Sequence, residues 1–329
     1  MKKNCILSVE NLNTKFYLER GVLHAVNNLN LNLYENEILG IVGESGCGKS
    51  VAVKSILNMI QKPGKITGKV IYRKDKINFD LLSLKSYHKK LRTIRGKEIM
   101  MVFQEPMNAL SMVHKICDQL TEAMIIHEGI NKKKAESRAI KLLSDVGIPN
   151  AENNLNSYPF QLSGGMRQRV MIAIAISTRP KILICDEPTT ALDVSVQAQI
   201  LSLLKNLQKE YGISIIFITH DLGVIAQIAN RIVVMYLGEK IEESSVDELF
   251  LEPKHPYTKK LLSSVPNIND KSKNRFLDTI EGYVPEPIDL PNICKFYNRC
   301  SESFSQCENN NPEMYNTKNN SSVRCLKYI

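Results

Sequence analysis

A glycine-rich run near the start of the chain has the residue types and spacing of a phosphate-binding loop. Residues 43–50 follow the pattern Gly-x-x-x-x-Gly-Lys-Ser. An apolar stretch typical of a buried strand, residues 38–42, precedes the run, and a predicted helix, residues 51–60, follows it. In that order of elements, main-chain N–H groups and the positive end of the helix converge on phosphate oxygens. The residues predicted to bind nucleotide here are Gly43, Glu44, Ser45, Gly46, Cys47, Gly48, Lys49 and Ser50.

Two side chains of this loop are expected to act directly. Lys49 is expected to reach the β- and γ-phosphate oxygens, and the Ser50 hydroxyl to ligate Mg²⁺. Cys47 is expected to offer mainly its main-chain N–H group. A glycine-rich turn that arose by chance is the alternative, and the full match between a strand and a helix disfavours it.

A second run places two acids at the end of another apolar strand. Residues 181–185 predict the strand, and Asp186 and Glu187 follow it directly. At the catalytic edge of a sheet, Asp186 is expected to hold Mg²⁺, directly or through water. Glu187 is assigned as the general base for an attacking water, a role typically worth about 10² to 10⁴ in rate. The alternative, that both acids cap the next segment, is disfavoured by Pro188.

These groups need a sheet to position them, and the hydrophobic pattern predicts one. Strand-like segments fill residues 1–40 and 66–80, and from residue 166 onward helices and strands alternate. This alternation favours a largely parallel sheet that helices cover. The predicted helices there are residues 166–177 and 196–210, and the predicted strands are residues 181–185, 213–219 and 232–236.

The middle of the chain has a different pattern, that of an inserted helical subdomain. Residues 86–165 look mostly helical. The clearest helix is residues 132–146, with Asn131 to cap its start and Gly147 to end it. After about residue 250, repeated prolines and polar residues indicate a C-terminal extension.

Length, charge and hydropathy set the broad class. The chain has 329 residues and a formal net charge of +9. Its basic residues are spread along the chain, so we interpret the charge as a solvated surface rather than a nucleic-acid-binding face. No apolar run approaches the roughly 18 residues that cross a bilayer, and the start of the chain lacks the apolar stretch of a secretory signal. We therefore expect a soluble, cytoplasmic protein whose membrane role comes through a partner.

A third motif points to a family. Residues 162–165 match the signature sequence of the ATP-binding cassette (ABC) family, followed by Met166 where many members have glutamine. Residues 1 to about 245 resemble the nucleotide-binding subunit of an ABC transporter. Ser163 precedes a predicted helix, so its hydroxyl and the glycine N–H groups can hold a γ-phosphate. The resemblance implies that two subunits pack head to tail and enclose two ATP molecules between them. The signature residues are Leu162, Ser163, Gly164, Gly165 and Met166.

The resemblance also implies roles for five further residues. Gln104 matches the loop glutamine that senses Mg²⁺ and touches the membrane subunit, and Asp193 matches a loop that crosses to the partner's site. His220 matches the switch histidine that contacts the γ-phosphate. Phe16 or Tyr17 fits the aromatic residue that stacks on adenine. The complete set of motifs implies a subunit that hydrolyses ATP.

Longer runs narrow the resemblance to importers of oligopeptides and dipeptides. They are residues 43–46, 103–107, 166–173, 193–200 and 255–258. The resemblance implies two membrane permease subunits, a second related ATPase subunit (identical or different) and, indirectly, an extracytoplasmic substrate-binding protein as partners. It places the chain at the cytoplasmic face of the cell membrane. One alternative cargo is nickel or another metal chelate. A soluble ABC-type ATPase acting on nucleic acid or ribosomes is less favoured, because the chain has one cassette and no coiled coil.

Four of the eight cysteines crowd into the end of the chain. Cys294, Cys300, Cys307 and Cys325 follow the spacing C-x5-C-x6-C-x17-C, and four thiolates are enough for Zn²⁺ or an iron–sulfur cluster. These gaps are wider than those of structural zinc sites, which favours a cluster, and the importer resemblance also implies a [4Fe–4S] centre. Four free thiols are the alternative.

The predicted fold class is α/β: a P-loop NTPase ABC cassette with a mostly parallel sheet and an antiparallel β subdomain. Residues 1–85 and 166–248 form the predicted nucleotide-binding core, and residues 86–165 form the inserted helical subdomain that carries the signature. Residues 249–329 form the Cys-rich C-terminal extension. The expected cofactors are ATP, Mg²⁺ and the cluster.

Overall fold

The chain divides into two units in the computed structural model, which describes residues 4–75, 77–190, 192–264, 280–317 and 321–329. Residues 265–279 of the predicted C-terminal extension therefore lie outside the described residues. The first unit contains Tyr34–Glu37 and Leu84–Ile218, and the second contains Cys5–Leu33, Ile38–Ser83 and Thr219–Ile329.

One sheet of the second unit is built from long strands near the start of the chain. Its order is β2-β1-β4-β5, and β4 is antiparallel to both of its neighbours. The segments predicted as strand-rich thus form strands. The bounds are β1 (Cys5–Leu18), β2 (Gly21–Tyr34), β4 (Gly64–Lys74) and β5 (Ile77–Asp80).

The other strands of the second unit lead to the phosphate loop. β3 (Ile38–Val42) pairs in parallel with β9 (Arg231–Tyr236), and β9 continues antiparallel to β10 (Glu239–Ser245). Every residue of β3 is buried, as expected for a strand covered on both faces. Two short strands, β12 (Ser322–Val323) and β11 (Tyr315–Asn316), extend the antiparallel edge.

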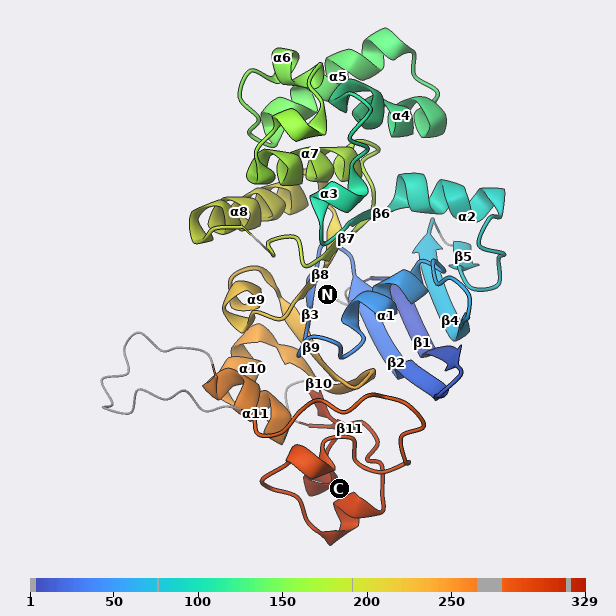
Figure 1. Ribbon diagram of the computed structural model, residues 1–329, viewed down its shortest axis with the longest axis vertical. Coiled ribbons are helices and arrows are strands. Elements are labelled where there is room, and N and C mark those ends of the chain that lie inside the picture. Colours follow the sequence, from blue (N-terminus) through green and yellow to red (C-terminus); the bar gives the residue numbers. More distant parts are fainter. Residues whose placement is uncertain (1–3, 76, 191, 265–279, 318–320) are drawn as a thin grey trace, which may run out of the picture. The chain divides into compact units, whose positions relative to one another are not determined.

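Helices of the second unit lie beside its strands in Figure 1. The predicted helix after the phosphate loop is confirmed, but it ends earlier than expected, at Ile56, because Asn58 takes a left-handed conformation with φ +53° that cannot continue a helix. The helices are α1 (Lys49–Ile56), α9 (Leu222–Ile228), α10 (Val246–Leu251) and α11 (Pro256–Ser263), with 3₁₀ turns η3 (Tyr297–Arg299), η4 (Ser305–Glu308) and η6 (Leu326–Tyr328).

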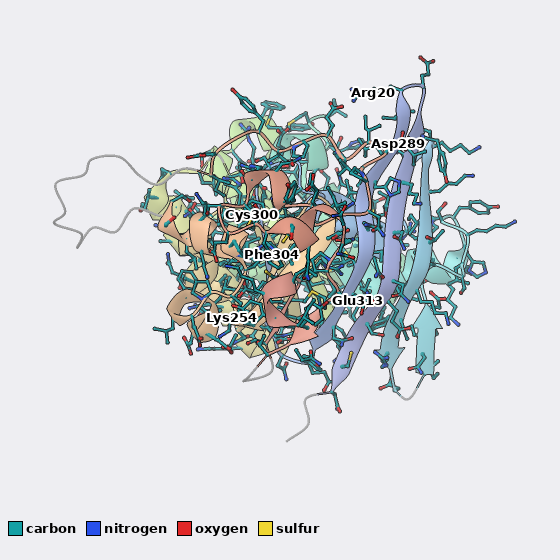
Figure 2. The ribbon with its side chains drawn as sticks, turned by 90° about the horizontal axis from the view of Figure 1, so that it is seen from below. Arg20, Lys254, Asp289, Cys300, Phe304 and Glu313 are labelled. Carbon is teal, nitrogen blue, oxygen red and sulfur yellow. The ribbon has the colours of Figure 1, made fainter. Side chains whose placement is uncertain are left out.

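A C-terminal segment lies beside the β1–β2 hairpin, as the labelled Arg20 and Asp289 show in Figure 2. Leu23 and Ile288 form an antiparallel bridge, and the Asp289 N–H donates to the Val22 carbonyl over 3.0 Å. Arg20 forms an exposed ion pair with Glu286 at 2.8 Å. These contacts hold residues 286–289 against the β1–β2 hairpin.

The first unit holds a parallel sheet of order β8-β7-β6, with β6 (Ile99–Val102), β7 (Ile182–Asp186) and β8 (Ser214–Thr219). Every residue of β7 and β8 is buried. Both strands agree with the sequence prediction to within one residue at each end. The sheet is therefore covered on both faces, which its continuous apolar runs require.

Helices make up most of the rest of the first unit, and α4 to α7 lie together in Figure 1. In the part of the chain that the structure describes, no helix combines the length and the apolar character that a bilayer crossing needs. The elements are α2 (Lys89–Thr93), the π-helix η1 (Ile94–Glu98), α3 (Pro106–Ala109), α4 (Ile116–Glu128), α5 (Lys132–Asp145), α6 (Ala151–Leu155), the 3₁₀ turn η2 (Pro159–Gln161), α7 (Gly164–Ile176) and α8 (Val194–Tyr211).

Helix α5 shows why the sequence pattern was informative. The Asn131 side chain accepts a hydrogen bond from the Lys134 N–H over 3.0 Å and so caps the helix. Gly147 follows its end with φ +77°. Its buried face is Ala135, Ala139, Leu142 and Leu143.

We expect Leu143→Ala to lower the free energy of unfolding of the helical layer by about 2–5 kcal/mol, because Leu143 is fully buried and its loss leaves a cavity. Hydrogen exchange of the α4–α7 amides measures this change. Lys141→Ala on the exposed face is the control, and it should change stability by no more than about 0.5 kcal/mol. Equal effects of the two substitutions would contradict the assigned buried face.

Candidate functional site

The phosphate loop passes so close to neighbouring main chain that only glycine fits at two of its positions. A Cβ atom at Gly43 would lie 2.3 Å from the Met235 carbonyl oxygen, and one at Gly48 would lie 2.2 Å from the Ala25 carbonyl oxygen. Both glycines have positive φ, +155° and +96°. The two end glycines of the motif are therefore required by space as well as by backbone conformation.

Lys49 is held inside the loop. Its ammonium group donates to the carbonyl oxygens of Gly43 and Glu44 over 2.8 and 3.0 Å, and the residue is only 4% exposed. The Cys47 carbonyl accepts a hydrogen bond from the Gly238 N–H over 2.9 Å. Burial raises the pKa of the Cys47 thiol, so the thiol stays protonated at neutral pH.

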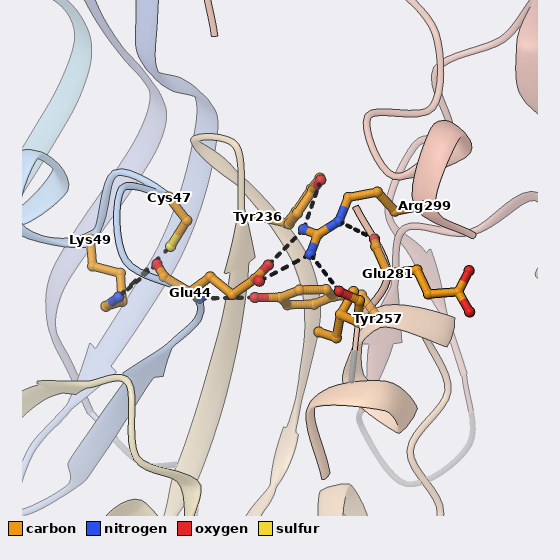
Figure 3. A network of polar contacts seen from close by, with 8 residues as sticks. Glu44, Cys47, Lys49, Tyr236, Tyr257, Glu281 and Arg299 are labelled. Carbon is orange, nitrogen blue, oxygen red and sulfur yellow. Dashed lines mark hydrogen bonds and ion pairs between the residues drawn. The ribbon is translucent and has the colours of Figure 1, made fainter. Parts of the chain in front are cut away.

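Glu44 contacts residues that the sequence did not single out as functional. Figure 3 shows its carboxylate facing Arg299 and its main chain facing Tyr257, two residues from the last third of the chain. No local motif links positions 255 residues apart, so these contacts could not be inferred from spacing. The phosphate loop thus belongs to a polar network that reaches the C-terminal region.

The two candidate adenine-stacking residues differ in exposure. Tyr17 is 49% exposed, with the Lys65 ammonium 4.9 Å from the centre of its ring. Phe16 is half-buried and lies close to Gly64. His220 is exposed and directly follows β8. Ser50, the predicted Mg²⁺ ligand of the loop, lies in the first turn of α1.

In the first unit, the predicted acids sit at the end of β7. Asp186 and Glu187 are buried, at 3% and 8% exposure. Glu187 has the unusual backbone angle φ +46°, and its N–H donates to the Ile218 carbonyl over 3.0 Å. Its Oε2 accepts hydrogen bonds from the Gln104 amide over 3.2 Å and from the Thr190 hydroxyl over 3.0 Å. The structure therefore brings two of the predicted catalytic residues, Gln104 and Glu187, into contact.

The signature run begins helix α7. Ser163 caps the helix, since its hydroxyl accepts from the Met166 N–H over 3.3 Å. A Cβ at Gly164 would meet no atom within 4 Å, whereas one at Gly165 would lie 3.0 Å from Val196. Leu162 is buried. Gly164 therefore faces open space at the positive end of a helix, a geometry suited to an anion.

Asp193 caps the neighbouring helix α8. Its carboxylate accepts a hydrogen bond from the Val196 N–H over 2.9 Å. This structural role exists alongside the interfacial role that the family resemblance implies, which remains a prediction.

The prediction of an iron–sulfur cluster is wrong. Cys294, Cys300, Cys307 and Cys325 do line one cavity, but among the described residues no group of three or more histidine, cysteine or acidic side chains is arranged to hold a metal ion. Burial raises the pKa of Cys294 to about 11 and also raises that of Cys300 and Cys325, which disfavours the thiolates that a cluster or Zn²⁺ needs. The spacing alone carried no information on how the thiols point.

Comparison with known families agrees with the motifs. A family model described as "ABC transporter" matches residues 26–190. A second, described as "Oligopeptide/dipeptide transporter, C-terminal region", matches residues 241–307. The two matches together span both the motif-bearing part of the chain and the C-terminal region.

Individual proteins are also similar to the chain. The oligopeptide transport ATP-binding protein AppD of Bacillus subtilis (strain 168) is 46% identical over 326 residues, 98% of this chain and 97% of AppD. The dipeptide transport ATP-binding protein DppD of Haemophilus influenzae is 44% identical over 310 residues, 94% of this chain and 92% of DppD. A dimeric post-hydrolysis structure of the ATP-binding cassette MJ0796 with ADP and Pi matches with a TM-score of 0.64 and 29% identity, covering 73% of this chain and 98% of that one. The predicted cassette fold is thereby confirmed.

We expect Gly48→Ala to weaken ATP binding by roughly 10- to 100-fold, because the new methyl group would force the loop away from Ala25 and strain its backbone. Titration calorimetry with ATP and Mg²⁺ measures the loss. Gly129→Ala is the matched control, since Gly129 also has positive φ (+68°) but open space around it. Unchanged ATP affinity in Gly48→Ala would show that the close approach to Ala25 is not needed.

Proposed function

Because the chain belongs to the ABC transporter family, as an ATP-binding subunit of its oligopeptide and dipeptide importers, we propose that it binds and hydrolyses ATP to energise peptide uptake. The observation that carries this proposal is the phosphate loop, in which Lys49 is buried and Gly43 and Gly48 leave no room for side chains. A turn of this kind can present main-chain donors and one ammonium group to phosphates.

Contacts with the phosphates and with adenine are assigned to residues of the second unit. Main-chain N–H groups of residues 43–50 and the Lys49 ammonium bind the phosphates, and Phe16 or Tyr17 stacks on adenine. The greater exposure of Tyr17 favours it over Phe16. His220, exposed after β8, contacts the γ-phosphate.

The chain offers suitable ligands for Mg²⁺. The Ser50 hydroxyl, the Gln104 side chain and the Asp186 carboxylate supply oxygen atoms, the ligand type that Mg²⁺ prefers, and Asp186 is buried at a strand end. When bound, Mg²⁺ neutralises charge on the phosphates.

Glu187 acts as the general base. It takes a proton from the attacking water while the water oxygen bonds to the γ-phosphorus, and the bond from that phosphorus to the bridging oxygen breaks so that ADP leaves with the electron pair. The hydrogen bonds from Gln104 and Thr190 to Oε2 fix the orientation of the carboxylate. The positive φ of Glu187 is the kind of local strain found at such sites.

The signature run and its neighbours act across a dimer. We assign Leu162, Ser163, Gly164, Gly165 and Met166, with Asp193, to the ATP bound by a second ATPase subunit. In this arrangement ATP is part of the interface, and its hydrolysis weakens the contact. The open space at Gly164 at the start of α7 supports the assignment.

The wider assembly is inferred from family membership. Two membrane permeases and a second ATPase subunit, identical or related, are the direct partners, and a substrate-binding protein acts outside the membrane. The chain would work at the inner face of the cell membrane. Residues 1–85 and 166–248 form the nucleotide core, residues 86–165 the helical insert that meets the permease, and residues 249–329 the C-terminal extension. ATP-dependent peptide uptake by vesicles that contain the purified complex tests the proposal.

Glu187→Gln should bind ATP with normal affinity but lose hydrolysis by about 10²- to 10⁴-fold, because the amide cannot accept the proton from water. Single-turnover hydrolysis and size-exclusion chromatography with ATP measure the two effects, and ATP-bound dimers should accumulate. Glu210→Gln, an exposed acid on α8, is the control. Normal turnover in Glu187→Gln would remove Glu187 as the base.

Gly164→Asp should abolish ATP-driven dimerisation while the fold stays intact. The new side chain has open space, and a carboxylate is favourable in the first turn of a helix, but it would repel the γ-phosphate. Gly164→Ala is the control and should dimerise with ATP as the unmodified protein does. If the aspartate variant also dimerises and hydrolyses ATP at the full rate, the signature does not grip phosphate.

A further inference from the structure

Glu44, the second residue of the phosphate loop, is held at both its main chain and its side chain by the C-terminal region. Its N–H donates to the Tyr257 hydroxyl over 2.9 Å. Its carboxylate accepts two hydrogen bonds from the Arg299 guanidinium, Nη1 to Oε2 over 2.8 Å and Nη2 to Oε1 over 3.1 Å. Figure 3 shows these contacts converging on Glu44 from one side. The pair is bidentate, the strongest geometry for an arginine and a carboxylate.

Groups other than Glu44 also hold the Arg299 side chain in place. Its Nε donates to the Glu281 carbonyl over 3.0 Å, and its guanidinium lies 5.9 Å from the centre of the Tyr236 ring. The Arg299 side chain is only 6% exposed. The fork it presents is thus pre-organised, unlike that of an arginine that moves freely in solvent.

An aromatic cluster supports both partners of Glu44. The rings of Tyr236 and Tyr257 lie 4.9 Å apart, and Phe296 lies 5.3 Å from the first and 5.4 Å from the second. Phe296 and Tyr257 are buried, and Phe296 precedes the 3₁₀ turn that carries Arg299. The cluster therefore fixes the Tyr257 hydroxyl and the Arg299 guanidinium relative to each other.

The same residue that these groups hold also holds the loop lysine. The Glu44 carbonyl accepts a hydrogen bond from the Lys49 ammonium over 3.0 Å, beside the bond from Lys49 to the Gly43 carbonyl. A shift of Glu44 would therefore move a hydrogen-bond partner of Lys49. An ion pair that only stabilised the fold would not be connected to the Lys49 ammonium group in this way.

We propose that Arg299 and Tyr257 are positioning residues for the phosphate loop, and that through them the C-terminal region sets the affinity of the site for ATP. The inference rests on the proposed binding of ATP at residues 43–50. Neither residue touches the nucleotide in this proposal, since both act through Glu44. Release of Glu44 would leave the loop to be ordered by ATP itself, so ATP binding would weaken.

The test compares four substitutions in the 329-residue chain. Arg299→Gln and Glu44→Gln each break the charged fork, and the two together complete a double-mutant cycle. Tyr257→Phe removes only a hydroxyl, and Arg299→Lys keeps the charge without the fork. Arg20→Gln is the control, because Arg20 forms an exposed ion pair with Glu286 of the C-terminal region and, within the described residues, makes no hydrogen bond or ion pair with the phosphate loop.

We expect Arg299→Gln to raise both the Kd and the KM for ATP roughly 10-fold with little change in kcat, because charge-assisted hydrogen bonds are lost from the free loop. Arg299→Lys should restore part of the affinity, and Tyr257→Phe should cause a smaller rise. The Arg299→Gln, Glu44→Gln double variant should be no weaker than the single variants. Arg20→Gln should bind ATP normally. Thermal melting of each variant separates these effects from unfolding.

Two other results have distinct meanings. If the unmodified chain does not bind ATP with Mg²⁺, the proposed function itself fails. If it binds ATP and Arg299→Gln melts earlier but keeps its Kd and KM, or if Arg20→Gln raises the KM equally, the Arg299 pair is only structural and the inference is overturned.

Discussion

The close contact between the phosphate loop and two neighbouring main chains is the constraint on which the rest of the second unit depends. At Gly43 and Gly48 the loop passes carbonyl groups of Met235 and Ala25 with no space for a Cβ atom. Those carbonyls lie on β9 and β2, so both strands must keep their register for the loop to keep its shape. The bond from the Gly238 N–H to the Cys47 carbonyl adds a third fixed point. The packing of β2 and β9 therefore determines the shape of the phosphate loop.

In the first unit, hydrogen bonds from side chains hold the carboxylate of Glu187 in place. Glu187 is buried, and burial of an acid is costly unless hydrogen bonds compensate for it. Gln104 and Thr190 supply such bonds at Oε2, and the Ile218 carbonyl accepts from the Glu187 main chain. The left-handed backbone at Glu187 then costs about 1–3 kcal/mol, which the surrounding sheet can bear because β7 and β8 are fully buried.

Features encoded within a few residues were predictable from the sequence. The strand before the phosphate loop and the cap at Asn131 both follow from the local sequence, and each is present in the structure. Ends of elements were less predictable, as with α1, where Asn58 stops the helix by adopting a conformation that no pattern announced. The contact between Gln104 and Glu187 was not predicted, since 83 positions separate the two and the family resemblance gave only a role for Gln104.

The spacing of residues along the sequence does not predict contacts between distant residues or the direction in which their side chains point. The four C-terminal cysteines line one cavity, but their spacing predicted neither the arrangement of their sulfur atoms nor the burial that raises the pKa of Cys294, Cys300 and Cys325. Glu44 and Arg299 illustrate the opposite case, in which a residue of the predicted phosphate loop forms a partly buried bidentate pair with an arginine 255 positions away that no motif singled out. In the pattern Gly-x-x-x-x-Gly-Lys-Ser, Glu44 occupies a position at which any residue type is allowed. Its carbonyl accepts a hydrogen bond from Lys49 and its carboxylate accepts from Arg299, so the residue links the loop that contains Lys49 to the C-terminal region.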